Sequence, residues 1–179
     1  ATGKSGDFNA AVDSVAVTTV GTGELTFSAA LGVDTLTNSG TVNIQSTTTN
    51  VAAGNETAVI MNLTGSVLNF NGASASAQDV IITAATTGFG TINVFDGTDD
   101  AAGGTTTLAA DALIGASGTP VGTLNVGKSD GTKGGNLTTA DGSAIFVNTL
   151  NITGGNHVDE DSLLSLHEAV TATTITLGA

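Results

Sequence analysis

A short pattern of polar and apolar residues returns along this chain. At its centre an Asn stands between two apolar residues, and a Thr or another small residue usually precedes them. The pattern occurs at Gly40–Ile44, Ser66–Phe70, Gly90–Val94, Gly122–Val126 and Asn148–Ile152, with a weaker copy at Thr173–Leu177. Because successive side chains of a strand point to opposite faces, each copy predicts a short β-strand with its Asn on one face and its apolar residues on the other.

The copies recur at intervals typical of repeat proteins. Their central polar residues occupy positions 43, 69, 93, 125, 151 and 176, which are 26, 24, 32, 26 and 25 residues apart. Units of this length cannot bury an apolar face alone and therefore stack on their neighbours. Most intervals hold one further apolar run, at Ala58–Leu63, Asp79–Thr83, Ala112–Ile114 and Ala144–Val147. We therefore predict an all-β parallel β-helix with turns of about 25 residues, and a loop inserted into the longest interval.

Some of these interpretations have alternatives. A β-sandwich or jelly roll completed by strand exchange fits the same alternation. The repeated Asn residues would either hydrogen-bond to one another across stacked strands or simply face solvent. Residues 161–170 fit either a short helix, capped by Asp161 or Ser162, or a strand.

The chain divides into an irregular start and a repetitive remainder. Residues 23–179 carry the repeats as one β domain. Residues 1–22 form an extended segment with apolar side chains at Val12, Val15, Val17 and Val20. We interpret this segment as a cap or as a strand donated to a neighbouring molecule.

The composition limits the partners. The 179 residues include 16 acids and three lysines, no Arg, Cys, Trp or Tyr, and a net charge of -13. Binding to phosphates needs a basic surface, so nucleic acid and anionic membranes are poor partners and cations are better ones. No apolar stretch is long enough to span a membrane, and the start has no signal-peptide pattern. If the protein is exported, we expect this sequence to be its mature form or an excised piece of it.

Motifs for catalysis are weak. Gly122–Ser129 matches the P-loop spacing, but its middle residues form a predicted strand and no helix can follow, so we expect no nucleotide. Two histidines, His157 and His167, without any Cys support neither a transition-metal site nor a catalytic triad. We therefore expect no catalytic residues and no cofactor other than calcium.

Two kinds of modified or ligated position remain as candidates. Loop carboxylates supply the oxygen ligands that calcium prefers, and two clusters offer them: Asp96, Asp99 and Asp100, and Asp159, Glu160 and Asp161. Neither cluster has EF-hand or β-roll spacing. N-glycosylation sequons begin at Asn55, Asn62, Asn136 and Asn151.

The repeated Gly-Thr-Leu-Asn-Val phrase resembles passenger domains of bacterial autotransporters and other haemagglutinin-like surface proteins, and the acidic, Cys-free composition is similar to that of prokaryotic surface-layer proteins. The resemblance covers residues 23–179 and implies an exported structural or adhesive role without catalytic residues. We expect a cell-surface or extracellular protein that self-assembles into a filament or layer. The predicted assembly residues are Val12, Val15, Val17, Val20, Ile175 and Leu177.

Two other functions stay open. One is an adhesin or glycan-binding module that contacts glycans or a host or cell surface through residues 96–104, although this loop has no aromatic residue to stack on a sugar. The other is a carbohydrate-active β-helix enzyme that uses a pair of carboxylates.

Overall fold

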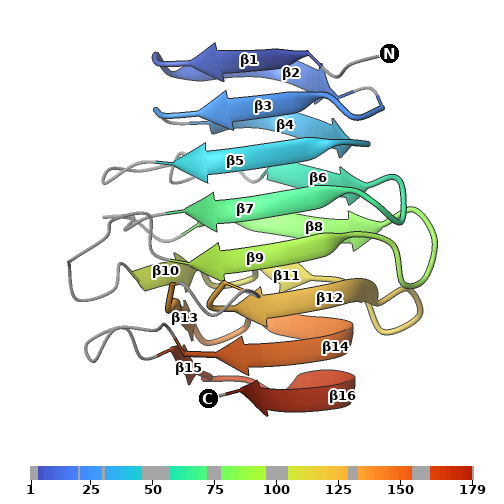
Figure 1. The fold of residues 1–179 in the computed structure, drawn as a ribbon, viewed down its shortest axis with the longest axis vertical. Helices are drawn as coiled ribbons and strands as arrows, with labels where there is room; N and C mark the ends of the chain where they lie inside the picture. The colour runs from blue at the N-terminus through green and yellow to red at the C-terminus, as the bar shows by residue number, and fades with distance from the viewer. Residues whose placement is uncertain are drawn as a thin grey trace.

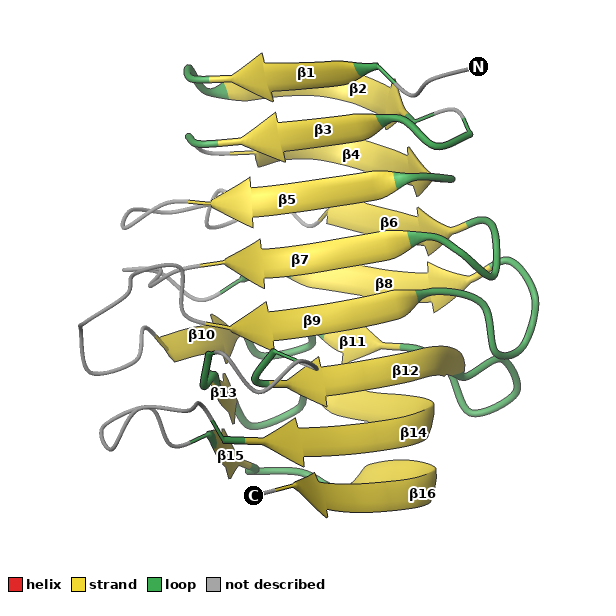
Figure 2. Cartoon of the chain, in the orientation of Figure 1, coloured by secondary structure: helices red, strands yellow, loops and turns green. Residues whose placement is uncertain are grey.

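The computed structural model describes residues 4–19, 21–29, 31–45, 57–71, 78–95, 105–128, 133–154 and 162–178. These residues form sixteen β-strands and no helix (Figure 2). The strands are β1 (Ser5–Phe8), β2 (Val12–Thr18), β3 (Glu24–Phe27), β4 (Leu31–Asn38), β5 (Thr41–Gln45), β6 (Thr57–Met61), β7 (Val67–Asn71), β8 (Val80–Ala84), β9 (Thr91–Phe95), β10 (Thr105–Leu108), β11 (Leu113–Ile114), β12 (Val121–Val126), β13 (Asn136–Thr139), β14 (Ala144–Thr153), β15 (Leu163–Ser165) and β16 (Val170–Gly178).

Thirteen of these strands form one sheet that curls back on itself into two stacked faces (Figure 1). The front face consists of β1, β3, β5, β7, β9 and β12, followed by residues 149–153 of β14 and 174–178 of β16. The back face consists of β2, β4, β6, β8 and β11, followed by residues 144–147 of β14 and 170–172 of β16. The long strands β14 and β16 therefore belong to both faces and close the sheet on one side.

All pairings between these strands are parallel, which excludes the sandwich alternative. A sandwich or jelly roll is built from antiparallel strands. In the described residues the one antiparallel contact is the isolated bridge between Ala116 and Thr119, inside a tight turn. The architecture is thus all-β and β-helix-like, as parallel strands joined by regular crossings require. A smaller parallel sheet, β10-β13-β15, adds a third side to the later part of the stack.

The core lies between the two faces because the strands alternate inward apolar and outward polar residues. In β7, for example, Leu68 and Phe70 are buried, whereas the Asn69 side chain between them is half-buried on the outside. The same inward positions are stacked in register along the front face, so that Leu68 pairs with Ile92 of β9 and Val42 of β5. Aliphatic side chains therefore stack in columns that run the length of the molecule.

Some tight corners of this stack require glycine. Gly115 has a φ of 72°, and a Cβ atom there would lie 2.0 Å from the backbone oxygen of Phe146. Gly127 has a φ of 91°, and its Cβ would lie 1.9 Å from the oxygen of Thr153. Both positions combine a left-handed backbone with a close approach of the next turn, so other residues are excluded on two grounds.

Backbone pairing decides the structure of two segments that the sequence left less certain than the repeats. Of the two alternatives for residues 161–170, the structure has the strand: the described part holds β15 and the start of β16, because neighbouring strands offer those backbone groups parallel partners. The start of the chain forms strands that pair in register with the rest, β1 with β3 and β2 with β4. Residues 5–18 are therefore the outermost level of the same stack.

Candidate functional site

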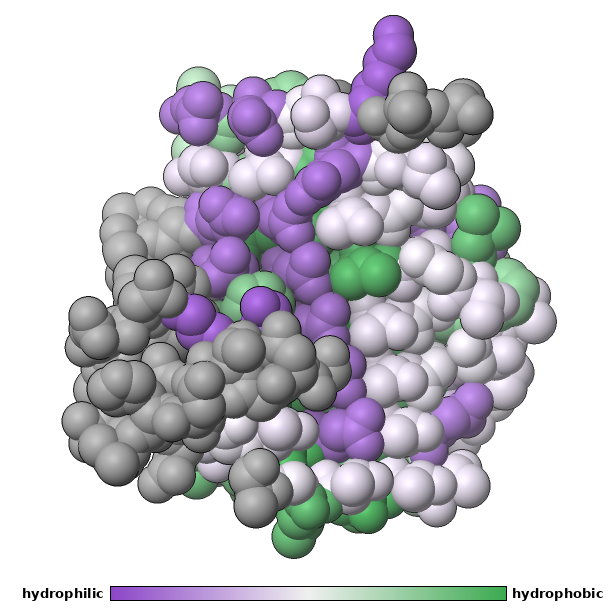
Figure 3. All heavy atoms as spheres, viewed as in Figure 1, coloured by the Kyte–Doolittle hydropathy of each residue, from purple (hydrophilic) through white to green (hydrophobic). Residues whose placement is uncertain are grey.

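Five asparagines form a hydrogen-bonded ladder along the outside of the front face. Each of the last four donates from its Nδ2 to the Oδ1 of the Asn one level closer to the N-terminus. The donor–acceptor distances are 2.7 Å for Asn69 to Asn43, 2.7 Å for Asn93 to Asn69, 2.7 Å for Asn125 to Asn93 and 2.8 Å for Asn151 to Asn125. A hydrophilic column follows this face of the molecule (Figure 3). Of the two roles expected for the repeated Asn, the hydrogen-bonded one is confirmed.

Glu24 sets the direction of this ladder. The first amide, Asn43, donates from Nδ2 to Glu24 Oε1 at 2.7 Å and more weakly to Thr26 Oγ1 at 3.3 Å. An ionised carboxylate only accepts hydrogen bonds, so Asn43 must turn its NH₂ group toward Glu24. Every later amide then has to present its oxygen to the next NH₂ group, and the amide dipoles align along the stack.

Sequence reasoning missed this end of the ladder. The register places Thr26 one level and Asp7 two levels before Asn43, in line with it. Neither is an Asn, so the repeated phrase gives no sign of them. The signal that would reveal them is the alternation itself, since Leu25 and Phe27 flank Thr26 as Val42 and Ile44 flank Asn43.

The C-terminal end of the stack exposes apolar side chains. Ile175 is 60% and Leu177 76% exposed, although both occupy positions whose counterparts one level earlier, Leu150 and Ile152, lie in or against the core. Leu163 of β15 and Leu166, which follows this strand, are exposed as well. Hydrophobic surface gathers at this lower end in Figure 3. Among the described residues, β16 pairs on one side only, with β14, so its outer backbone edge is open.

The N-terminal end is more polar. Its outer strand β1 carries the exposed Ser5, Asp7 and Phe8 around a half-buried Gly6. The ring of Phe8 stacks on that of Phe27, with centroids 5.1 Å apart and planes at 10°. A charged residue on an edge strand discourages the addition of another strand, so β1 protects this end.

Three of the remaining predicted assembly residues lie at the same end. Val12 and Val17 are half-buried in β2 and pack against the core. Val15 also belongs to β2, and Val20 lies outside the described residues. The predicted assembly residues that the structure describes thus fall at the two opposite ends of the stack.

Both candidate calcium clusters, at Asp96, Asp99, Asp100, Asp159, Glu160 and Asp161, lie outside the described residues. Within the described ranges, no three His, Asp or Glu side chains come close enough together to hold a metal ion. His167, which the sequence does not support as a metal ligand, donates through its backbone N–H to Thr139 Oγ1 at 3.0 Å. The calcium sites therefore stay predictions.

The sequon asparagines lie in different surroundings. Asn62 is exposed in a turn, where its Nδ2 donates to Ser39 Oγ at 3.0 Å. Asn136 begins β13, and Asn151 is the last amide of the ladder. Asn55 lies outside the described residues. Of the described three, Asn62 is the one whose side chain is exposed.

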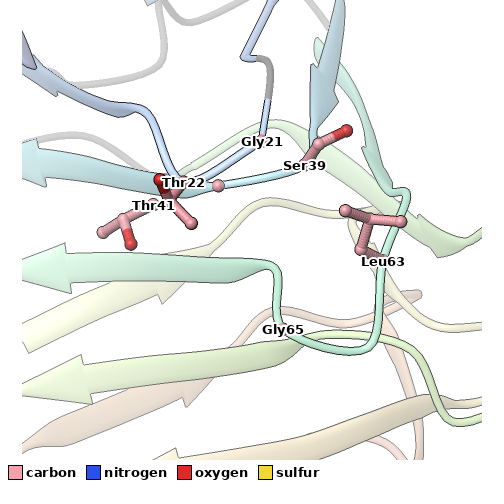
Figure 4. A pocket seen from close by; sticks show the side chains of 7 residues that line it. Gly21, Thr22, Ser39, Thr41, Leu63 and Gly65 are labelled. Carbon is pink, nitrogen blue, oxygen red and sulfur yellow. The ribbon is translucent and has the colours of Figure 1, made fainter. Parts of the chain in front are cut away.

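A shallow pocket of about 300 Å³ lies at one lateral edge, among the turns that precede β3, β5 and β7 (Figure 4). Its lining residues are Gly21, Thr22, Ser39, Gly40, Thr41, Leu63 and Gly65. Three of the seven are Gly, and none of the Thr, Ser and Leu side chains of the other four titrates near neutral pH. The pocket therefore offers neither an acid nor a base for catalysis.

No protein-family model, curated protein or solved structure matches this chain. In the described parts of the chain, no helix is long and apolar enough to cross a membrane.

Proposed function

We propose that this chain is an exported prokaryotic structural protein, a parallel β-helix with turns of about 25 residues, whose copies stack end to end into an extracellular or cell-surface filament or layer. The observation that carries the proposal is the apolar β16 end, whose outer edge has no partner among the described residues and continues the columns of the core outward. Its function would lie in contacts between subunits and would need no catalysis.

The parallel sheet supports one kind of assembly. An open edge that continues a parallel stack meets the opposite end of another copy, not its own equivalent. Such a heterologous contact leaves the same two ends free after each addition, so it generates an open polymer. Backbone hydrogen bonds across the junction would add to the apolar contact.

The apolar contribution follows from the exposed side chains. Complete burial of a Leu or Ile side chain contributes about 1.5–3 kcal/mol. Ile175 and Leu177 have 60% and 76% of that burial still to gain. Together they would stabilise each junction by about 3 kcal/mol, which is more than a hundredfold in the association constant.

Light scattering on the purified chain tests the proposal. The wild type should form polymers as its concentration rises. The double variant Ile175→Lys/Leu177→Lys should stay monomeric, because stacking would bury two unpaired charges. Leu63→Lys is the matched control, since Leu63 is 45% exposed but lies in a lateral turn, and it should polymerise like the wild type. A wild type that stays monomeric at every concentration would refute the proposal.

A further inference from the structure

The two faces of the stack end at different heights. Counted over the described residues, the front face has eight strand levels, from β1 to residues 174–178. The back face has seven, from β2 to residues 170–172. The difference arises because the outermost strand at each end, β1 and the last half of β16, lies on the front face (Figure 1).

This unequal count decides how a second copy fits. If β1 of the incoming copy pairs with the front half of β16, its β2 lies two strand spacings, about 10 Å, from the back half of β16. One strand is then missing on the back face. If β2 pairs directly with the back half of β16, both faces continue without a gap, but β3 and not β1 lies against the front half.

We propose that the assembly surface is the outer edge of β2 and β3, that its partner is the β16 edge of a second copy, and that β1 must leave β3 before the two join. The inference rests on the proposed function and adds to it the docking surface and the step that exposes it. β1 is then a detachable cap on the growing stack.

The side chains of β3 fit this junction better than those of β1. Continuing the register places Ile175 against Leu25, Leu177 against Phe27 and Thr176 against Thr26. These are the aliphatic, polar and apolar columns found at every level of the front face from β3 to β16. With β1 in place, Ile175 would instead meet Gly6, which has no side chain to cover it, and Thr176 would meet the charged Asp7.

The back face agrees with the same arrangement. Its columns place Val17 of β2 in line with Leu36, Ile145 and finally Val170 of β16. Direct pairing of β2 with the back half of β16 therefore sets Val17 against Val170, both partly buried and packed against the core of their own copy. An apolar column continues through the junction on this face as well.

β1 is the strand best suited to leave. It has only four residues, three of them exposed, and pairs on one side with β3. The side-chain contacts that hold β1 on β3 include the stacking of the Phe8 ring on that of Phe27, and Phe8 is itself 38% exposed. Every interior strand of the front face, by contrast, has a partner on both sides.

The axial repeat of the polymer distinguishes the two junctions. Seven levels at about 4.8 Å give a rise of about 34 Å per copy, whereas eight levels give about 38 Å. We expect about 34 Å by helical reconstruction from cryo-electron micrographs. A rise of about 38 Å would overturn the inference and leave the proposed function standing.

A disulfide that locks β1 onto β3 provides the second test. Asp7 and Thr26 are direct partners in the parallel register, at a spacing that a disulfide can bridge, and the chain has no Cys of its own. Oxidised Asp7→Cys/Thr26→Cys should lose polymerisation and regain it on reduction. The matched control is Thr91→Cys/Thr123→Cys, which joins interior partners of β9 and β12 and should polymerise in both states.

A loosened β1 should have the opposite effect. Phe8→Ser removes the ring that stacks on Phe27, so we expect faster growth than in the wild type. Two results would contradict the displacement of β1. One is equal polymer growth by the oxidised and the reduced Asp7→Cys/Thr26→Cys variant; the other is slower growth by Phe8→Ser than by the wild type. If the wild type forms no polymer, the proposed function fails and this inference fails with it.

Discussion

Replacing Asn93 by Leu should break the side-chain ladder in its middle. Asn93 donates to Asn69 at 2.7 Å and accepts from Asn125 at 2.7 Å, so the variant loses two hydrogen bonds. Leu has nearly the same size as Asn. Because position 93 faces outward, the apolar inner side of the strand is unchanged. The partner groups Asn69 Oδ1 and Asn125 Nδ2 would be left without their ladder bonds.

The expected loss follows from these two bonds. An intramolecular hydrogen bond contributes about 0.5–1.5 kcal/mol net. Two bonds amount to about 2 kcal/mol, reduced somewhat because Leu suits a strand better than Asn does. Asn151→Leu breaks a single ladder bond, to Asn125, and should cost about 1 kcal/mol. The ratio between the interior and the terminal variant is therefore about two.

Urea unfolding followed by far-ultraviolet circular dichroism measures these losses, since the chain has neither Trp nor Tyr for fluorescence. The series is made on the monomeric Ile175→Lys/Leu177→Lys background, because association would otherwise raise the apparent stability. Thr123→Leu is the control: Thr123 is a half-buried residue of β12 outside the ladder, and its change should stay within about 0.5 kcal/mol. Equal midpoints for Asn93→Leu and Thr123→Leu would refute the claim that the ladder stabilises the stack.

Three further predictions concern the corners of the stack and its charge. Asn38 is fully buried, accepts from the Thr19 hydroxyl at 2.9 Å and donates to the Val67 oxygen at 2.8 Å, so Asn38→Ala should lower the free energy of unfolding by about 2–4 kcal/mol; an unchanged urea midpoint would contradict this. Gly127→Ala should lower the thermal midpoint by several degrees, whereas Gly65→Ala, where a Cβ meets nothing within 4 Å, should not; equal melting curves would show that the corner tolerates a side chain. Because each copy carries a charge of -13, polymerisation should be faster at 0.15 M than at 0.01 M salt, where the screening length rises from about 8 to about 30 Å; slower growth at higher salt, followed by light scattering, would contradict end-to-end contact between like-charged copies.

Much of the front face was predictable from the repeated phrase. The polar positions 43, 69, 93, 125, 151 and 176 are direct partners in the parallel register, as their spacing indicates. The alternation of each copy fixes which side chains are buried, because a shift of one residue would turn the apolar set outward. The same reasoning correctly placed strands over the apolar runs now seen as β6, β8 and β11.

Other features depend on partners that the sequence does not reveal. The third side, β10-β13-β15, consists of short Thr-rich or mixed segments such as Thr105–Leu108, whose local pattern differs little from that of a turn. The composition of residues 161–170 fits a helix or a strand, and pairing with β13 and β14 makes the described part strand. Glu24 has an assignable role only once Asn43 is seen beside it.

The sequence indicates the C-terminal end of the stack better than the N-terminal end. Ile175 and Leu177 follow the repeat, so their exposure at the end of the stack could be anticipated from the pattern. Phe8 lies in a segment without the phrase, so the pattern does not predict that its ring stacks on that of Phe27. The unequal number of strands on the two faces emerges only from the pairing, because the sequence does not show that β1 lies on the front face.

Cryo-electron microscopy of the purified wild-type chain tests the central claim most directly. We predict unbranched filaments one molecule wide, with the strand spacing of about 4.8 Å repeating along the filament axis because the strands stack in that direction. Discrete monomers at every concentration, or filaments in which that spacing runs across the axis, would contradict end-to-end stacking.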